Sequence, residues 1–318
     1  MKVLWLSTES NKDRFYGFTE YLKQACDLTE HWLSPKQAKH VVKAVGAKNI
    51  KGYDRVLLQL PVSQLVQQTA YLRCVPNLVL LQPALASVAL NNSKDFEKYL
   101  KFFNTAPWVR VMVPYGQLKS DLVKHKVDVM DVPIGINMAW FRDKEKERRH
   151  WAAIVANLDS PDVKSRRQLL YDVKTQNKLQ IFDEAEMAAL GDQLNTMGVV
   201  VVSDEGWKNY RPLNFQALAS GAVLLTWDRG EEENKACGFE DLENVVLYKN
   251  AKGAQAKLNF LRRHPEELEK VRTKGIQFVQ QFHSNRALGE CVIQCLQHPL
   301  KEFSGDDVED AVKFRFFR

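Results

Sequence analysis

The sequence predicts an α/β protein made of two doubly wound domains, each with a parallel sheet covered by helices. Short apolar runs typical of buried strands alternate with helical stretches along most of the chain. Alternating strands and helices favour parallel sheets, because each crossover lays a helix on one face of the sheet. The alternation falls into two consecutive series of similar size, and a length of 318 residues suits two domains.

The first series occupies residues 1–142. Leucine-rich or β-branched runs predict strands at residues 3–6, 55–60, 78–81, 109–113 and 127–131. Apolar residues at helical spacing predict helices between them at residues 16–26, 65–73, 95–103 and 118–123. The opening MKVLWLS is interpreted as the first strand, because its apolar run is too short for a signal peptide and no small-residue cleavage site follows.

The second series occupies residues 143–297. Its charged opening, DKEKERRH at residues 143–150, suits a solvated linker on the surface. Strands are predicted at residues 151–156, 199–202 and 222–226, with helices at 165–171 and 184–195 and a third that begins at Pro212 and is closed by Gly221. The second domain therefore repeats the alternation of the first.

The most informative stretch is residues 198–226, which read GVVVVSDEGWKNYRPLNFQALASGAVLLT. A buried strand leads through a polar loop into a short helix that Pro212 begins and Gly221 ends. Free backbone N–H groups and the dipole at a helix N-terminus favour anions. Because Lys208 and Arg211 add positive charge at this point, we expect a phosphate site at the start of the helix.

The same stretch resembles the donor-binding segment of GT-B glycosyltransferases, especially the group-1 branch that includes CgeB-like spore-maturation proteins. Those enzymes show the pattern N-x-R-x-x-(N)-F-E-A-L-A-x-G, and residues 209–221 here read NYRPLNFQALASG. The resemblance continues in order through ENVVLYKN (243–250), RRHPEELEKVRTKG (262–275) and FHSNRALGE (282–290). Further back, DVPIGINMAWF (131–141) is similar to the family's crossover between domains.

The resemblance implies a GT-B fold, with two Rossmann-like domains facing a central cleft. Residues 1–142 would then bind the acceptor, residues 143–297 would bind the nucleotide-sugar donor, and the tail of residues 298–318 would cross back to the first domain. The implied activity is transfer of a sugar from a donor such as a UDP- or GDP-sugar to a hydroxyl of a glycan or lipid-linked glycan. The nucleotide sugar is a co-substrate, and no other cofactor is implied.

We also expect the transfer to be independent of a metal ion. GT-B enzymes usually stabilise the departing diphosphate with backbone dipoles and cationic side chains. The metal-using class typically shows a DxD motif at a strand end, and the nearest composition here, Asp307-Val308-Glu309, lies in the tail.

The resemblance assigns the donor site residue by residue. Arg211 and the N–H groups around Tyr210 would hold the pyrophosphate, and Gln216 the ribose with help from Asn214. Relatives place a cationic residue of the loop at residues 157–167 against the same phosphates, although those cations would also suit a solvated helix start. The complete set of expected donor residues is Lys164, Arg166, Arg167, Lys208, Asn209, Tyr210, Arg211, Asn214 and Gln216.

Two positions depart from the family pattern. A glutamate that accepts hydrogen bonds from ribose is replaced by Gln216, whose amide oxygen accepts without charge. Eight residues earlier, many relatives carry a glutamate that touches the donor sugar, and this chain has Lys208. The departures keep a second interpretation open, in which a degenerate GT-B protein binds a nucleotide or a partner without turnover.

The acceptor and any general base are expected at the carboxyl ends of the strands in the first domain. The loop after the first strand contains Glu9 and Asp13, and either carboxylate could deprotonate an acceptor in an inverting reaction. Ordinary capping of the following helix is the alternative role for these residues. A retaining reaction would need no such base.

The formal net charge of +6 is compatible with a phosphorylated donor, an anionic membrane surface or an acidic acceptor. It therefore leaves open a phage-type enzyme that glycosylates hydroxylated bases in DNA. The final stretch, SGDDVEDAVKFRFFR (304–318), either docks back onto the first domain or presents basic and aromatic residues to a membrane or acceptor.

No apolar stretch is long enough to span a membrane, so we expect a cytoplasmic protein, with peripheral contact at the inner face of the membrane as an option. The cysteine count is five, which is odd, and no CxxC motif occurs. Neither a disulfide framework nor a zinc site is indicated.

Overall fold

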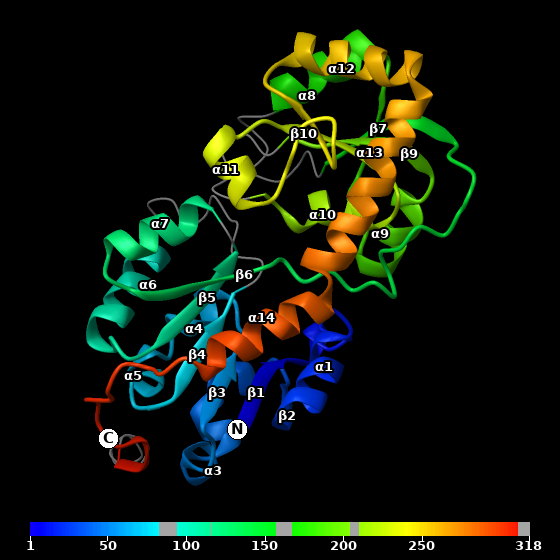
Figure 1. The fold of residues 1–318 in the computed structure, drawn as a ribbon. Coiled ribbons are helices and arrows are strands. Elements are labelled where there is room, and N and C mark those ends of the chain that lie inside the picture. The colour runs from blue at the N-terminus through cyan, green and yellow to red at the C-terminus, as the bar shows by residue number, and fades with distance from the viewer. Residues whose placement is uncertain (83–93, 115, 157–166, 204–209, 311–318) are drawn as a thin grey trace. The chain divides into compact units, whose positions relative to one another are not determined.

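The computed structural model describes residues 1–82, 94–114, 116–156, 167–203 and 210–310 (Figure 1). The chain divides into two compact units: unit 1 is Met1–Gly135 together with Leu288–Arg318, and unit 2 is Ile136–Ala287. Two parallel sheets, one in each unit, agree with the predicted α/β fold class.

The division between the units differs from the expected limits after residues 142 and 297. Ile136 belongs with unit 2 because its backbone N–H donates to the carbonyl of His283 at 2.8 Å, and its own carbonyl accepts from Asn285 at 2.9 Å. The chain returns to unit 1 at Leu288, inside helix α14 (Asn285–Gln297), so the return begins before the expected tail.

Unit 1 contains a parallel sheet in the order β2-β1-β3-β4-β5-β6. Its strands are β1 (Lys2–Thr8), β2 (Asp27–Leu33), β3 (Arg55–Leu58), β4 (Leu78–Leu81), β5 (Arg110–Pro114) and β6 (Asp128–Val132). Its helices are η1 (Glu9–Asn11), α1 (Phe18–Ala25), η2 (Gln37–Lys39), α2 (Val41–Val45), α3 (Ala47–Lys51), α4 (Val62–Leu65), α5 (Thr69–Leu72), α6 (Lys94–Thr105) and α7 (Gln117–Lys124), followed by the part of α14 from Leu288.

Successive side chains of a strand point to opposite faces of the sheet, and both faces of the unit 1 sheet are buried. Leu4 and Leu6 face the core that α6 and α7 cover, whereas Val3 and Trp5 face the core that α1 and α14 cover. Figure 1 shows α14 running beside the strands of this unit. Helix α14 therefore completes one half of the core of unit 1.

The predicted helix at residues 65–73 is in fact two short helices, α4 and α5, with Gln68 between them. The buried Gln68 amide accepts from the N–H of Val41 at 3.0 Å and donates to the carbonyl of Ala38 at 2.9 Å. This side chain satisfies the backbone of a neighbouring segment, and the helix is interrupted where it does so.

Unit 2 contains a parallel sheet in the order β11-β10-β9-β7-β8. Its strands are β7 (His150–Val155), β8 (Gln180–Phe182), β9 (Met197–Val201), β10 (Val223–Trp227) and β11 (Val246–Tyr248). Its helices are α8 (Arg167–Asn177), α9 (Met187–Leu194), α10 (Pro212–Ala219), α11 (Glu231–Ala236), α12 (Ala251–Arg263) and α13 (Pro265–Phe278), which continues into the π-helical segment η5 (Val279–His283). Helices α8 and α12 pack against one face of the sheet through Leu170, Val173 and Leu258.

Candidate functional site

Helix α10 begins and ends as the sequence predicts. Pro212 occupies its first turn after Arg211, which has the extended conformation of an N-cap residue, and Gly221 follows the helix with a φ of +76°. Strand β9, which leads towards α10, lies between β10 and β7 in the sheet. The start of α10 therefore lies at the carboxyl edge of an interior strand, where open α/β sheets bind their ligands.

Gln216 is the polar side chain of α10 that the fold leaves unused. It is 8% exposed, and its side-chain amide makes no hydrogen bond to any residue that the structure describes. An amide that the fold leaves unpaired can still donate and accept hydrogen bonds. A ligand hydroxyl is a chemically suitable partner for it.

Asn214 and Tyr210 serve the fold instead. The Asn214 amide donates to the carbonyl of Arg211 at 3.1 Å and accepts from the Thr226 hydroxyl at 2.8 Å, which ties the start of α10 to β10. The buried Tyr210 hydroxyl lies 2.6 Å from Asn234 Oδ1. Both side chains hold the start of α10 in place.

Arg211 pairs with Glu184, a residue that the sequence analysis did not single out. One guanidinium nitrogen lies 3.3 Å from the Glu184 carboxylate, and the Arg211 side chain is 14% exposed. Glu184 was expected inside a helix, but α9 begins at Met187, so Glu184 lies in the preceding loop. This ion pair keeps a cation beside the N-terminus of α10.

Residues 147–290 match the model of a family described as glycosyl transferase-like. The whole chain is also similar to the solved structure of HepE from Anabaena in complex with UDP and glucose. That likeness has a TM-score of 0.65 and 10% sequence identity, and it covers 94% of this chain and 100% of the other.

The chain has the GT-B fold, with one Rossmann-like parallel sheet in each unit. Sucrose-phosphate synthase from Thermosynechococcus elongatus aligns with a TM-score of 0.62 and 12% identity, over 93% of this chain and 98% of that one. An α-glucosyltransferase in complex with UDP-glucose and DNA containing an abasic site aligns with a TM-score of 0.64 and 9% identity, over 94% and 100% of the two chains. A comparison with curated proteins finds no match. The CgeB-like branch stays a prediction.

In this GT-B chain, a hydrogen-bonded network at the carboxyl end of β10 supports the start of α10. Asp228 accepts from the Asn234 amide at 2.8 Å and from the Gly230 N–H at 2.9 Å, and it lies 3.3 Å from Lys249 Nζ. Burial works to raise the pKa of Asp228, but these hydrogen bonds outweigh burial and hold the pKa below its ordinary value. Asn234 links the network to the hydroxyl of Tyr210.

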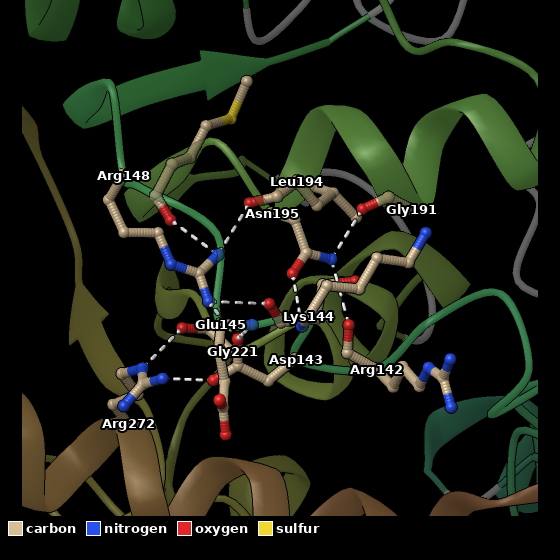
Figure 2. Close-up of polar contacts among 12 residues, drawn as sticks. Arg142, Asp143, Lys144, Glu145, Arg148, Gly191, Leu194, Asn195, Gly221 and Arg272 are labelled. Atoms are coloured by element: carbon tan, nitrogen blue, oxygen red, sulfur yellow. Dashed lines mark hydrogen bonds and ion pairs between the residues drawn. The ribbon is translucent and has the colours of Figure 1, made fainter.

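The C-terminus of α10 is held by two arginines that share one carboxylate (Figure 2). Arg148 donates to the carbonyl of Ser220 at 3.1 Å, and Arg272 donates to that of Gly221 at 3.0 Å. Asp143 pairs with both guanidinium groups. Cations at a helix C-terminus complement the helix dipole, and burial lowers the pKa of Arg148.

The network differs from the exposed linker expected at residues 143–150. The side chains of Asp143 and Arg148 are only 14% and 20% exposed. Arg148 also donates to the carbonyls of Leu194 and Met197, at 3.3 and 3.4 Å. The segment therefore fixes α9, β9 and α10 relative to one another within unit 2.

The expected catalytic carboxylates, Glu9 and Asp13, lie in unit 1, in the loop after β1. Both side chains are exposed, and their backbone carbonyls accept from the N–H groups of Lys12 and Tyr16, at 3.1 and 3.2 Å. The loop belongs to the carboxyl edge of the sheet. The position suits a base, and it suits an ordinary turn equally well.

Several expected donor residues cannot be placed. Lys164, Arg166, Lys208 and Asn209 lie outside the described residues, as does the basic aromatic end of the tail at residues 313–318. Arg167 begins α8. The structure thus brings together Tyr210, Arg211, Asn214 and Gln216 at the start of α10.

Among the described residues, no group of three or more potential ligands could hold a metal ion. Asp307 lies 2.7 Å from Lys51 Nζ, so the acidic pair of the tail contacts α3. None of the described helices is long and apolar enough to cross a membrane.

Proposed function

We propose that this protein moves a sugar from a nucleotide-sugar donor to a hydroxyl of an acceptor, with the donor bound at the start of α10. The observation that carries the proposal is that α10 has a cation, Arg211, at its N-cap and an amide without a described partner, Gln216, on the helix that follows. The ribose hydroxyls of a nucleoside diphosphate can hydrogen bond to the Gln216 amide, and its phosphates can pair with the Arg211 guanidinium. The bound UDP of HepE supports a UDP-sugar as donor, with a GDP-sugar as the alternative.

The chemistry follows from these positions. The acceptor oxygen forms a bond to the anomeric carbon while the bond from that carbon to the phosphate oxygen breaks. The electron pair leaves with the diphosphate, which Arg211 and the N–H groups of the helix start stabilise. The acceptor proton passes to a base, for which Glu9 or Asp13 is our proposal if the reaction inverts configuration. We propose that no metal ion takes part.

The remaining expected donor residues complete the proposal. Lys164, Arg166 and Arg167 would add positive charge near the phosphates, and Lys208 and Asn209 would contribute from the loop before α10. Asn214 would act by holding the helix start, since its amide already hydrogen bonds to Arg211 and Thr226. We propose the first domain, expected at residues 1–142 and found as unit 1, as the acceptor part, and the second, expected at residues 143–297 and found as unit 2, as the donor part.

Two alternatives are supported by particular observations. A DNA acceptor is supported by the similar α-glucosyltransferase, whose structure contains DNA. A degenerate protein that binds a nucleotide without turnover is supported by Gln216 and Lys208, which stand where the family has glutamates. A cytoplasmic enzyme with peripheral contact at the inner membrane face fits either a glycan or a lipid-linked glycan.

A thermal-shift experiment with UDP, GDP and their sugar conjugates tests the donor site. A diphosphate at a hundred times its Kd should stabilise the folded state by about 2.7 kcal/mol. Arg211→Ala should weaken binding by about 1.5–3 kcal/mol, because a charge-assisted hydrogen bond is lost. Arg263→Ala, an exposed arginine at the end of α12, is the control and should bind as the wild type does. The donor site is wrong if no diphosphate shifts the melting temperature.

Gln216→Glu distinguishes the degenerate protein from the enzyme. A carboxylate accepts stronger hydrogen bonds from ribose than an amide does, so UDP should bind more tightly and 2′,3′-dideoxy-UDP should not. Hydrolysis of UDP-glucose is then measured with the wild type and the variant. Turnover by the wild type supports an enzyme, whereas turnover only by the variant supports the degenerate protein.

A further inference from the structure

Neutral polar side chains form a network at the carboxyl edge of the unit 1 sheet. Ser7 near the end of β1 donates to Gln59 Oε1 at 2.7 Å, and Gln59 directly follows β3. The Asn11 amide donates to the same oxygen at 2.9 Å and to Thr8 Oγ1 at 2.9 Å. Two adjacent strands and the loop after β1 therefore present amides and hydroxyls at one place.

The network leaves part of its hydrogen-bonding capacity unused. Among the described residues, neither Gln59 Nε2 nor Asn11 Oδ1 has a hydrogen-bond partner. One amide thus offers N–H donors and the other offers an acceptor oxygen. If both side-chain amides were flipped, the atoms without a partner would again be one N–H₂ donor and one acceptor oxygen. A hydroxyl group, which both donates and accepts, matches this pair.

Gln82 extends the same edge to the next strand. It follows β4, and its side-chain N–H₂ donates to the carbonyl of Leu60 at 2.8 Å. The residue is 5% exposed, and its amide oxygen has no partner within the described part of the chain. This oxygen keeps its capacity to accept a hydrogen bond, so it is a second point at which a ligand hydroxyl could bind.

The segments around this network carry no excess of positive charge. In the loop after β1, Glu9 and Asp13 balance Lys12 and Arg14. The segment QLPVSQ after β3 contains no charged residue. A polyanion such as DNA is bound chiefly through lysine and arginine contacts to phosphates, so this composition is poorly suited to one.

We infer that Gln59, Asn11 and Gln82 form a binding site for a neutral, hydroxyl-rich carbohydrate acceptor. The inference rests on the proposed function and names its acceptor class. The site binds hydroxyls through amide donors and acceptors that the sheet holds in place. Its affinity does not depend on neutralising charge.

Saturation-transfer NMR with two kinds of probe tests the site. The first probe is a panel of neutral oligosaccharides of glucose and N-acetylglucosamine, and the second is a DNA duplex that contains hydroxymethylcytosine. A neutral oligosaccharide should bind with an affinity that stays unchanged between about 50 and about 200 mM salt, because no counterions are released. Gln59→Leu and Asn11→Leu should each weaken it about three- to tenfold, the effect of a lost neutral hydrogen bond.

Gln24→Leu, an exposed glutamine on α1, is the matched control and should bind the oligosaccharide as the wild type does. The inference is overturned if only the DNA binds, if no oligosaccharide binds, or if both variants at the network bind normally. The UDP thermal shift is measured on the same variants, which should keep it. If the wild type shows the UDP shift but binds no oligosaccharide, this site alone is rejected. If the wild type shows no UDP shift, the proposed function is rejected.

Discussion

Polar residues close together on the segment that starts α10 have different physical roles. Asn214 and Tyr210 are hydrogen bonded inside unit 2, whereas the Gln216 amide is buried without a described partner. The sequence predicted that these residues gather at one helix start. It could not predict which of them the fold would satisfy, because Thr226 and Asn234 come from later segments.

His283 gives a prediction about acid stability. Burial lowers its pKa to about 3, although a hydrogen bond with the backbone of Cys237 opposes this. The centroid of its ring lies 4.2 Å from the ring centroid of Phe215 and 5.0 Å from that of Phe278. Below the ordinary histidine pKa the unfolded chain binds a proton that the folded chain excludes. The free energy of unfolding should therefore fall by about 1.4 kcal/mol per pH unit as the pH drops from about 6.5 towards 3.

His283→Gln removes the titration and keeps a hydrogen-bond donor. Urea unfolding of both proteins between pH 7 and pH 4 measures the difference. The variant should lose less stability than the wild type over this interval. Parallel pH profiles for the two proteins would show that His283 does not contribute.

At the scale of the element, α10 is held at both ends by different chemistry. Its start is fixed by Asn214 and by the network of Asp228, and its end by Arg148 and Arg272. Gly221 is part of the second contact, because a Cβ there would lie 2.6 Å from Arg148 Nη2 and 2.6 Å from Asp143 Cγ. Glycine at this position leaves room for the side chains of Arg148 and Asp143 at the end of the helix.

Gly221→Ala should destabilise unit 2. Gly221 has a φ of +76°, so alanine there incurs the conformational cost of the left-handed region, about 1–2 kcal/mol. The Cβ would also press on the side chains of Arg148 and Asp143, which should add about 1–3 kcal/mol of overpacking. Urea unfolding of the variant and of the wild type measures the loss. A loss of no more than about 2 kcal/mol, the conformational cost alone, would contradict the role of the contact.

The elements that the sequence predicted correctly are those whose formation depends on residues close together in the chain. The cap residues of α10 and the apolar interior strands were found, since Pro212, Gly221 and β-branched runs act through nearby backbone. The edge strands β2 and β8 were missed, because DLTEHWL is largely polar and QIF is very short. The pairing of Asp143 with Arg272 joins residues 129 positions apart, and no periodicity in the sequence reports such a contact.

At the scale of the whole molecule, unit 1 is discontinuous and unit 2 is not. Leu288, Val292 and Leu296 of α14 pack into a core that also contains Val3 and Trp5. The end of α14 is fixed by Arg110, which donates to the carbonyl of Cys295 at 3.2 Å and pairs with Asp128 at 3.1 Å. Helix α14, from Leu288 on, is therefore a structural part of unit 1.

Leu296→Ala should destabilise unit 1, whereas Leu258→Ala should destabilise unit 2. Both leucines are buried, at 0% and 2% exposure, so each cavity should cost about 2–5 kcal/mol. Hydrogen exchange followed by mass spectrometry resolves the strands of the two sheets. Leu296→Ala should speed exchange in β1 and β3, and Leu258→Ala in β7 and β9. Faster exchange of the unit 2 strands in Leu296→Ala would contradict the division of the chain.

The return of α14 to unit 1 also has a consequence for biosynthesis. Unit 2 is complete once residue 287 has left the ribosome, but unit 1, although its sheet is translated first, lacks Leu288, Val292 and Leu296 until unit 2 has been made. Until then, Val3 and Trp5 lack the helix that covers them, and exposed apolar surface of this kind attracts chaperones and promotes aggregation. A nonsense mutation shortly after residue 287 would consequently abolish the unit that was made first and spare the one that was made second.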